Sequence, residues 1–497
     1  MKNPLDKADP NQYLRIDHLK VNLKQRSIRG GVITVVSQTI KFLLQIGSTA
    51  VIARLLSPED YGLFGMVAVI AKFMSHFKDL GLATATAQRS EINQEQTSAL
   101  FWINVTFGCI TAICITLLAP AIARFYNEPR LTEITLAIAS SFIVSGLTVQ
   151  YQALLKRQME FTSLAKIEIF SMVVGVVTGI STAWLGLGYW VLVLMLITTA
   201  ISNAVGVWLA CGWRPKRPLW TAEVVSMLAF GRNLTGFNLT NYFSRNLDNI
   251  LIGRYWGAEE LGFYGKAYQL LLLPVRQISF PLARVALPTL SRLQTEPEKH
   301  SRYYYKANLL MTIFGFPLVA FAFTCADKII LLVLGQKWLE VVPIYRLLAP
   351  AAFMSLLDVP LKWAYTSLNR TDRLLRWGII SSVINIVIFL SGLRWGAIGI
   401  AATYGLSRPI YQLVAFCYCF QGTHLNLAEL IKTLSQPAIA SLGAAAMMIG
   451  INHLLPDTIN IFIYLSLDLL LYILIYLTIW MILPNGKKTL LGILKIF

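Results

Sequence analysis

The sequence predicts an all-α integral membrane protein of about 14 transmembrane helices, with two parallel six-helix lobes around a central cleft plus two C-terminal helices. Three observations predict this class. Hydrophobic residues make up 56% of the 497 residues and charged residues only 14%, whereas soluble domains carry about 25% charged residues. The mean hydropathy is +0.60, and apolar runs of membrane-crossing length recur along the chain. Similar loops follow the first and the seventh of these runs.

Hydropathy places the spans in order along the chain. Residues 1–29 form an N-terminal arm, which is not a cleavable signal because the apolar run after it is long enough to span. We expect an interfacial half-helix within 327–345, because Ile329–Leu334 is too short to cross. The predicted spans are 30–53, 62–82, 98–123, 131–152, 167–186, 189–210, 224–253, 261–290, 307–325, 342–366, 377–393, 397–420, 433–453 and 458–483.

Short connectors leave no room for a large domain outside the membrane. This excludes most enzymes with a water-side catalytic domain, and it excludes nucleic-acid binding as the reason for the net charge of +18. If the N-terminus is inside, most Lys and Arg residues of the connectors also fall inside, so both termini are expected to be cytoplasmic. We read the six cysteines as packing residues and expect no metal and no cofactor.

The loops Ala53–Gly65 and Gly253–Gly265 match without a gap at an offset of 200. Two favourable interfacial turns could look alike, but an ungapped match favours a repeat. Six helices separate the copies, so both enter the membrane in the same direction, as in parallel repeats. The predicted domains are the arm 1–29, an N-lobe 30–210, a cytoplasmic linker 211–223, a C-lobe 224–420 and a C-terminal segment 421–497 with two helices and a tail.

Many basic residues fall within predicted spans, where each costs about 2.5–3.5 kcal/mol at mid-bilayer. The main acids found there, Asp79, Asp248, Asp358 and Asp468, are too few to neutralise them. A hydrated, positive cleft between the lobes would solve this problem, although residues near span ends could instead reach the interface. The basic residues are Lys41, Lys72, Lys78, Arg232, Arg245, Lys266, Arg276, Arg284, Arg346, Lys362 and Arg408.

Helical spacing places polar residues of the seventh helix on one stripe that ends with Arg245 and Asp248. The first helix carries the matching stripe, with Lys41 and Gln45, at the offset of 200. Arg245 and Asp248 could also form only an internal ion pair. The candidate substrate-binding residues are Lys41, Gln45, Asn238, Asn241, Arg245, Asp248, Arg276, Arg284 and Arg408. Such a cationic cleft favours an anionic cargo with phosphate or carboxylate groups.

Two runs, Ala53–Gly62 and Arg245–Arg254, resemble the signatures of Wzx-type polysaccharide exporters. The resemblance extends from about Arg29 to the fourteenth span and is closest to the colanic-acid-exporter-like branch. That branch belongs to the superfamily of multidrug, oligosaccharidyl-lipid and polysaccharide exporters. The resemblance implies a flippase of a bacterial inner membrane, which moves an undecaprenyl-diphosphate-linked oligosaccharide repeat unit from the cytoplasmic to the outer leaflet. We expect a monomer that works by alternating access, with the lipid-linked saccharide, the membrane and the polysaccharide polymerase machinery as partners.

Three alternatives remain at this point. A multidrug exporter of the same superfamily would be expected to carry carboxylates in its cleft, whereas cations dominate here. A lipid II-type flippase would have a similar cationic cleft. A membrane-embedded sugar polymerase or ligase would carry a sizeable outer loop with acids, His and Arg, and no Ser-His-Asp, Cys-His or paired-carboxylate pattern is found in this sequence. The sequence therefore favours a transporter over an enzyme.

Overall fold

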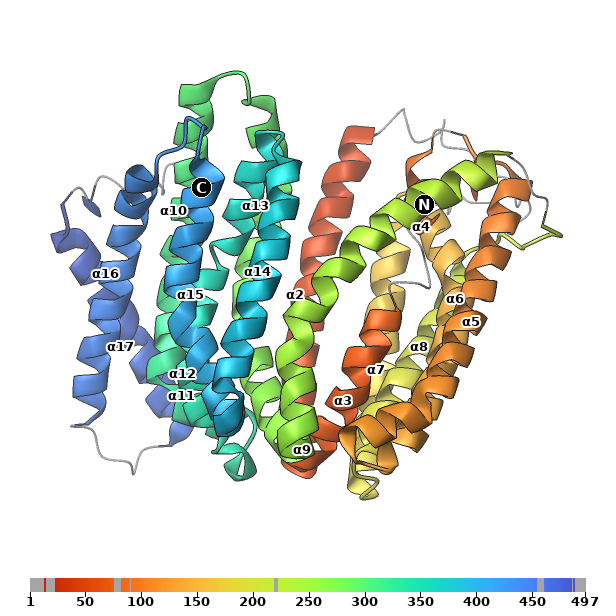
Figure 1. The fold of residues 1–497 in the computed structure, drawn as a ribbon, viewed down its shortest axis with the longest axis horizontal. Helices are drawn as coiled ribbons and strands as arrows, with labels where there is room; N and C mark the ends of the chain where they lie inside the picture. The colour runs from red at the N-terminus through yellow and green to blue at the C-terminus, as the bar shows by residue number, and fades with distance from the viewer. Residues whose placement is uncertain are drawn as a thin grey trace. The chain divides into compact units, whose positions relative to one another are not determined.

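The computed structural model describes residues 13–14, 23–75, 82–89, 91–218, 222–453, 460–484 and 486–487. Over these residues the chain forms helices and no strand, which confirms the predicted all-α class (Figure 1). The chain divides into two compact units, residues 1–262 and 263–497.

The first unit is built from long helices packed side by side. Within it α5 packs on α6, α7 on α8, and α2 on α7. Its helices are α2 (Leu23–Leu55), α3 (Pro58–Met74), α4 (Leu82–Gln88), α5 (Gln94–Tyr126), α6 (Arg130–Arg157), α7 (Phe161–Trp184), α8 (Trp190–Ala210) and the first half of α9 (Ala222–Arg292).

The second unit contains the rest of α9 and the helices that follow it. Here α12 packs on α15, α10 on α16, and α14 on α15. The helices are α10 (Pro297–Thr324), α11 (Ala326–Val333), η2 (Gln336–Trp338), α12 (Val341–Ser355), α13 (Asp358–Ser367), α14 (Thr371–Gly392), η3 (Leu393–Trp395), α15 (Gly396–Phe420), α16 (Leu427–Asn452) and α17 (Ile461–Ile482).

Eleven helical stretches of the described chain are long and apolar enough to cross a membrane. The difference from the predicted number has a simple cause. The helix α3 has 17 described residues, which is slightly short, and two pairs of predicted spans join into the continuous stretches Asn246–Arg292 and Thr371–Phe420. The predicted short segment at 327–345 is found as α11 and η2.

Two helices are interrupted at defined points. In α9, Gly257 has φ +87° and ψ −173°, a backbone conformation that only glycine adopts readily. The predicted spans 224–253 and 261–290 therefore meet at one residue rather than at a loop. The predicted span 342–366 is also in two pieces, because α12 ends at Ser355 and α13 begins at Asp358.

The repeated loops meet in the first unit through two glycines. A Cβ on Gly62 would overlap the carbonyl oxygen of Ala258, and a Cβ on Gly262 would overlap that of Pro58. Pro58 and Gly62 of the first loop correspond to Ala258 and Gly262 of the second at the offset of 200. Each glycine therefore contacts the equivalent residue of the other loop, and the two loops cross with local twofold symmetry. The backbones approach so closely only because both positions lack a side chain.

The signature run Ala53–Gly62 has a local role that explains its composition. Ser57 caps α3, accepting a hydrogen bond from the backbone N–H of Asp60, and the Asp60 carboxylate accepts one from the Ser57 backbone N–H. This reciprocal arrangement satisfies two otherwise unpaired donors, and Pro58 suits the first helical turn. The signature therefore builds a helix start directly before the glycine crossing.

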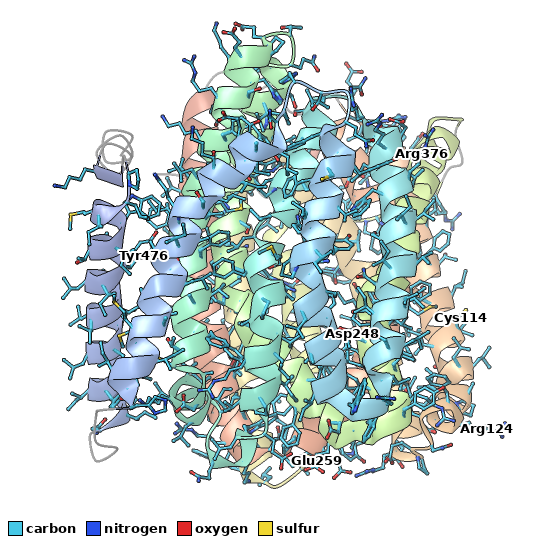
Figure 2. All side chains as sticks on the ribbon, turned by 60° about the vertical axis from the view of Figure 1, so that its left-hand side comes forward. Cys114, Arg124, Asp248, Glu259, Arg376 and Tyr476 are labelled. Atoms are coloured by element: carbon cyan, nitrogen blue, oxygen red, sulfur yellow. The ribbon has the colours of Figure 1, made fainter. Side chains whose placement is uncertain are left out.

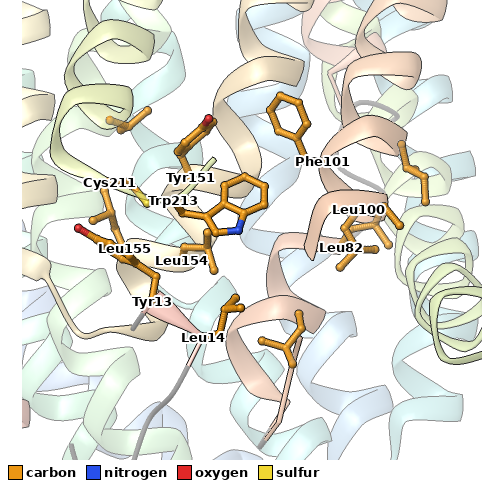
Figure 3. Close-up of a cluster of buried hydrophobic side chains, with 14 of the residues drawn as sticks. Tyr13, Leu14, Leu82, Leu100, Phe101, Tyr151, Leu154, Leu155, Cys211 and Trp213 are labelled. Atoms are coloured by element: carbon orange, nitrogen blue, oxygen red, sulfur yellow. The ribbon is translucent and has the colours of Figure 1, made fainter. Parts of the chain in front are cut away.

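Part of the N-terminal arm belongs to a hydrophobic core of the first unit. Tyr13 and Leu14 are buried in a cluster with Tyr151 and Trp213 (Figure 3). Arg157 donates hydrogen bonds to the backbone carbonyl of Leu14, and Gln158 donates to that of Tyr13. The first residues of the predicted linker are held in the same core, because the Trp213 indole donates to the Gln94 side chain over 2.5 Å.

Candidate functional site

The cation predicted on the first membrane-spanning helix lies opposite an acid. The Lys41 ammonium on α2 is 2.6 Å from a carboxylate oxygen of Glu168 on α7, and the two side chains are 22% and 41% exposed. Sequence reasoning did not count Glu168 among the intramembrane acids, although it is the second residue of the predicted span 167–186. A search of span ends for carboxylates would have counted this acid, although it would not have paired it with Lys41.

A second ion pair lies in the second unit. The Arg408 guanidinium on α15 donates to both carboxylate oxygens of Asp358 at 3.0 Å, and its centre lies 4.5 Å from the ring centroid of Tyr411. Asp358 is the first residue of α13, just after the break from α12. The negative carboxylate at a helix start is favoured by the helix dipole. The pairing of Asp358 with Arg408 ties the start of α13 to α15.

The surroundings of Arg408 contain polar atoms without hydrogen-bond partners. Arg408 is 5% exposed and Gln412, one helical turn later, is 2% exposed. In the described part of the chain, neither Nε of Arg408 nor either amide atom of Gln412 has a partner. Such buried, unsatisfied groups destabilise a fold by about 1–3 kcal/mol each. Sequence reasoning missed Gln412, although its i, i+4 spacing from Arg408 places both on one helix face.

Arg276 differs from these two cations because its side chain is exposed. It lies on the stretch Asn246–Arg292, which is long and apolar enough to cross a membrane. At 1.5 Å per residue it is roughly 28 Å from Gly257 and roughly 24 Å from Arg292 along the helix. Among the described side chains, no carboxylate pairs with it.

The remaining candidates are placed only in part. Gln45 is half-buried on α2. Asp248 is 3% exposed, and its Oδ1 accepts the backbone N–H of Asn249 at 2.8 Å. Figure 2 shows Arg124 and Glu259 near one end of the first unit, with Asp248 further into it. Four candidates lie on α9 with side chains outside the described part of the structure, namely Asn238, Asn241, Arg245 and Arg284.

Comparison with known proteins gives the family. A family model described as "Polysaccharide biosynthesis protein" matches residues 51–343, which is more than half of the chain. The chain belongs to this family. The matched residues include both copies of the repeated loop and the glycine crossing.

Two relatives extend over most of the chain. The lipopolysaccharide biosynthesis protein WzxC of Escherichia coli (strain K12) is 25% identical over 403 residues, which cover 80% of this chain and 81% of that protein. The teichuronic acid biosynthesis protein TuaB of Bacillus subtilis (strain 168) is 25% identical over 441 residues, covering 87% of this chain and 90% of that protein. The predicted resemblance to Wzx-type polysaccharide exporters is confirmed.

A solved structure shares the fold. The lipid II flippase MurJ in its inward closed conformation superposes with a TM-score of 0.72 at 15% sequence identity, covering 91% of this chain and 98% of that chain. This polysaccharide biosynthesis protein is therefore a multi-pass membrane protein with a transporter fold.

Proposed function

We propose that this protein is a flippase, not an enzyme, that moves an anionic undecaprenyl-diphosphate-linked oligosaccharide from the cytoplasmic to the outer leaflet. Its family, the name of WzxC and the fold shared with a lipid II flippase support a lipid-linked saccharide as the cargo. The excess of Lys and Arg in alternate connectors supports an orientation with both termini in the cytoplasm, and the bacterial relatives support a location in a bacterial inner membrane.

One observation carries the choice of an anionic cargo. Arg276 is an exposed guanidinium without an acidic partner among the described side chains, on a helix that crosses the membrane. A charge in the hydrocarbon layer costs about 2.5–3.5 kcal/mol at mid-bilayer, and less nearer the surface, unless water or a counter-charge solvates it. A diphosphate supplies that counter-charge, and arginine binds it through two parallel hydrogen bonds.

Lys41 and Arg408 contribute in a different way, because each already has a carboxylate partner. In the proposed cycle the diphosphate competes with Glu168 and Asp358 for these cations. The unpaired Nε of Arg408 and the Gln412 amide are buried in this structure, so in the proposed cycle they can donate to the head group only once this region opens. The two repeats alternate between inward and outward access while the lipid tail stays in the bilayer.

The test is a replacement of the cation in cells that depend on this protein for polysaccharide export. Arg276→Ala should abolish export, and saccharides linked to undecaprenyl diphosphate should accumulate, as measured by mass spectrometry of lipid extracts. Arg292→Ala, at the exposed end of the same helix, is the matched control and should export normally. Normal export by Arg276→Ala at wild-type protein levels would contradict the proposed role of this cation. Accumulation of lipid II alone would instead support the lipid II-type alternative.

A further inference from the structure

An apolar groove of about 470 Å³ runs between α2 and α7 in the first unit. Leu43, Gly47 and Val51 line it from α2, and Val176 and Ile180 line it from α7. Gly47 opens the groove, because a Cβ built there would meet no atom within 4 Å. The position of the missing Gly47 side chain therefore faces open space in the groove wall.

The chemistry of the lining selects the occupant. The polar side chain in the lining is Ser48, and its hydroxyl already donates to the backbone carbonyl of Gln45 at 3.1 Å. Leu43 and Val51 are 62% and 40% exposed, on a helix that crosses the membrane. A groove with these walls, surrounded by hydrocarbon, suits an unbranched or isoprenoid lipid chain rather than a polar ligand.

A charge at one end of the groove distinguishes between lipids. Ile40 lines the groove, and the next residue is Lys41 with its Glu168 partner. Lys41 lies roughly 16 Å from Gly30 and roughly 21 Å from Leu55 along α2, which places it near the middle of a hydrocarbon layer about 30 Å thick. The phosphates of bulk phospholipids stay at the surface and do not reach this depth. A lipid whose diphosphate crosses the membrane does reach it.

We propose that this groove holds the polyprenyl tail of the cargo while its diphosphate passes Lys41. The inference deepens the proposed function and rests on it. The apolar chain follows α2 from Lys41 towards Leu55, so the head group and the tail are recognised by neighbouring parts of one helix pair.

The test fills the groove and compares a long with a short lipid. The purified full-length protein is mixed with undecaprenyl diphosphate or with isopentenyl diphosphate, whose five-carbon chain is too short to reach Gly47 from Lys41, and bound lipid is measured by native mass spectrometry. Gly47→Leu should weaken binding of undecaprenyl diphosphate by about tenfold, equivalent to about 1.4 kcal/mol, and leave the short analogue unchanged. Val176→Trp, which fills the groove from α7, should act in the same way. Gly31→Leu is the matched control, because Gly31 is an exposed glycine of α2 with no atom near its Cβ position.

The outcomes separate this inference from the function that it rests on. Wild-type affinity of both groove variants for undecaprenyl diphosphate would overturn the groove as the tail site, while the flippase function would stand. Equal displacement of undecaprenyl diphosphate by excess phosphatidylglycerol would also overturn it, because the groove would then hold bulk lipid. Failure of the wild-type protein to bind either diphosphate would instead contradict the proposed cargo.

Discussion

Gly62 and Gly262 lie 200 residues apart and make equivalent contacts. Gly62 lies against the backbone of Ala258, and Gly262 lies against the backbone of Pro58. The repeat found in the sequence is therefore a physical crossing of two backbone segments. It joins the start of α3 to the part of α9 that follows Gly257. Neither segment could approach the other if either glycine carried a side chain.

Alanine at either crossing glycine should destabilise the protein. Gly62→Ala or Gly262→Ala forces backbones apart, and overpacking of this kind costs roughly 1–3 kcal/mol. Gly65→Ala and Gly265→Ala are controls at the same offset, because their Cβ atoms would meet only an ordinary contact or open space. Thermal unfolding in detergent should show lower midpoints for the first pair only. Equal midpoints for all four variants would show that the crossing is not tightly packed.

Opposite replacements in the Lys41–Glu168 pair should have opposite effects on binding. Glu168→Gln frees the ammonium from its partner, so undecaprenyl diphosphate should bind more tightly, by up to about fivefold for a partly exposed pair. Lys41→Gln removes the cation and should weaken binding. Titration of the purified variants followed by native mass spectrometry measures both effects. Changes of the same sign would show that the pair matters only for the fold, since either replacement breaks it.

Gln412→Leu should raise the thermal stability of the protein. The amide is buried without a partner in the described chain, and its replacement by an apolar side chain removes a penalty of about 1–3 kcal/mol. Export should fall, because the proposed cycle uses this amide as a donor to the diphosphate head group. The control is Gln150→Leu, which should lower stability, because Gln150 is buried and donates to Thr86 at 3.0 Å. A melting midpoint below that of the wild type for Gln412→Leu would contradict the view that the Gln412 amide lacks hydrogen-bond partners.

The fold should lose stability in mild acid through His424. The His424 Nε2 atom lies 3.0 Å from Nδ1 of His300. Burial, together with the nearby charge of Arg370, lowers the pKa of His424. The unfolded chain then binds the proton more readily than the folded one, so stability is complete above about pH 6.5 and falls as the pH decreases below that value. His424→Gln should reduce the difference between melting midpoints at pH 7.5 and pH 5.5. If the variant shows the same difference between its two melting midpoints as the wild type, the acid sensitivity comes from other groups.

The helices and the repeat could be predicted because both are local properties of the chain. Apolar length defines a span, and the matched loops at Gly62 and Gly262 share a pattern that needs no tertiary information. The partner of Lys41 could not be predicted, because Glu168 is 127 residues away and only helix packing brings them together. The same holds for Arg408 and Asp358. Helical spacing predicts which face of its helix a cation occupies, but it does not predict which other helix packs against that face.

The burial of Tyr13 and Leu14 limits how the amino end of this protein can be altered. Arg157 is 5% exposed and donates to the carbonyl of Leu14. A shortened chain that starts at Gly30 would remove one acceptor of this guanidinium, which would keep the carbonyls of Thr86 and Arg89, and would open a gap beside Trp213. A purification tag should therefore be added in front of the complete amino-terminal arm, so that Tyr13 and Leu14 are kept, or be placed at the carboxyl end.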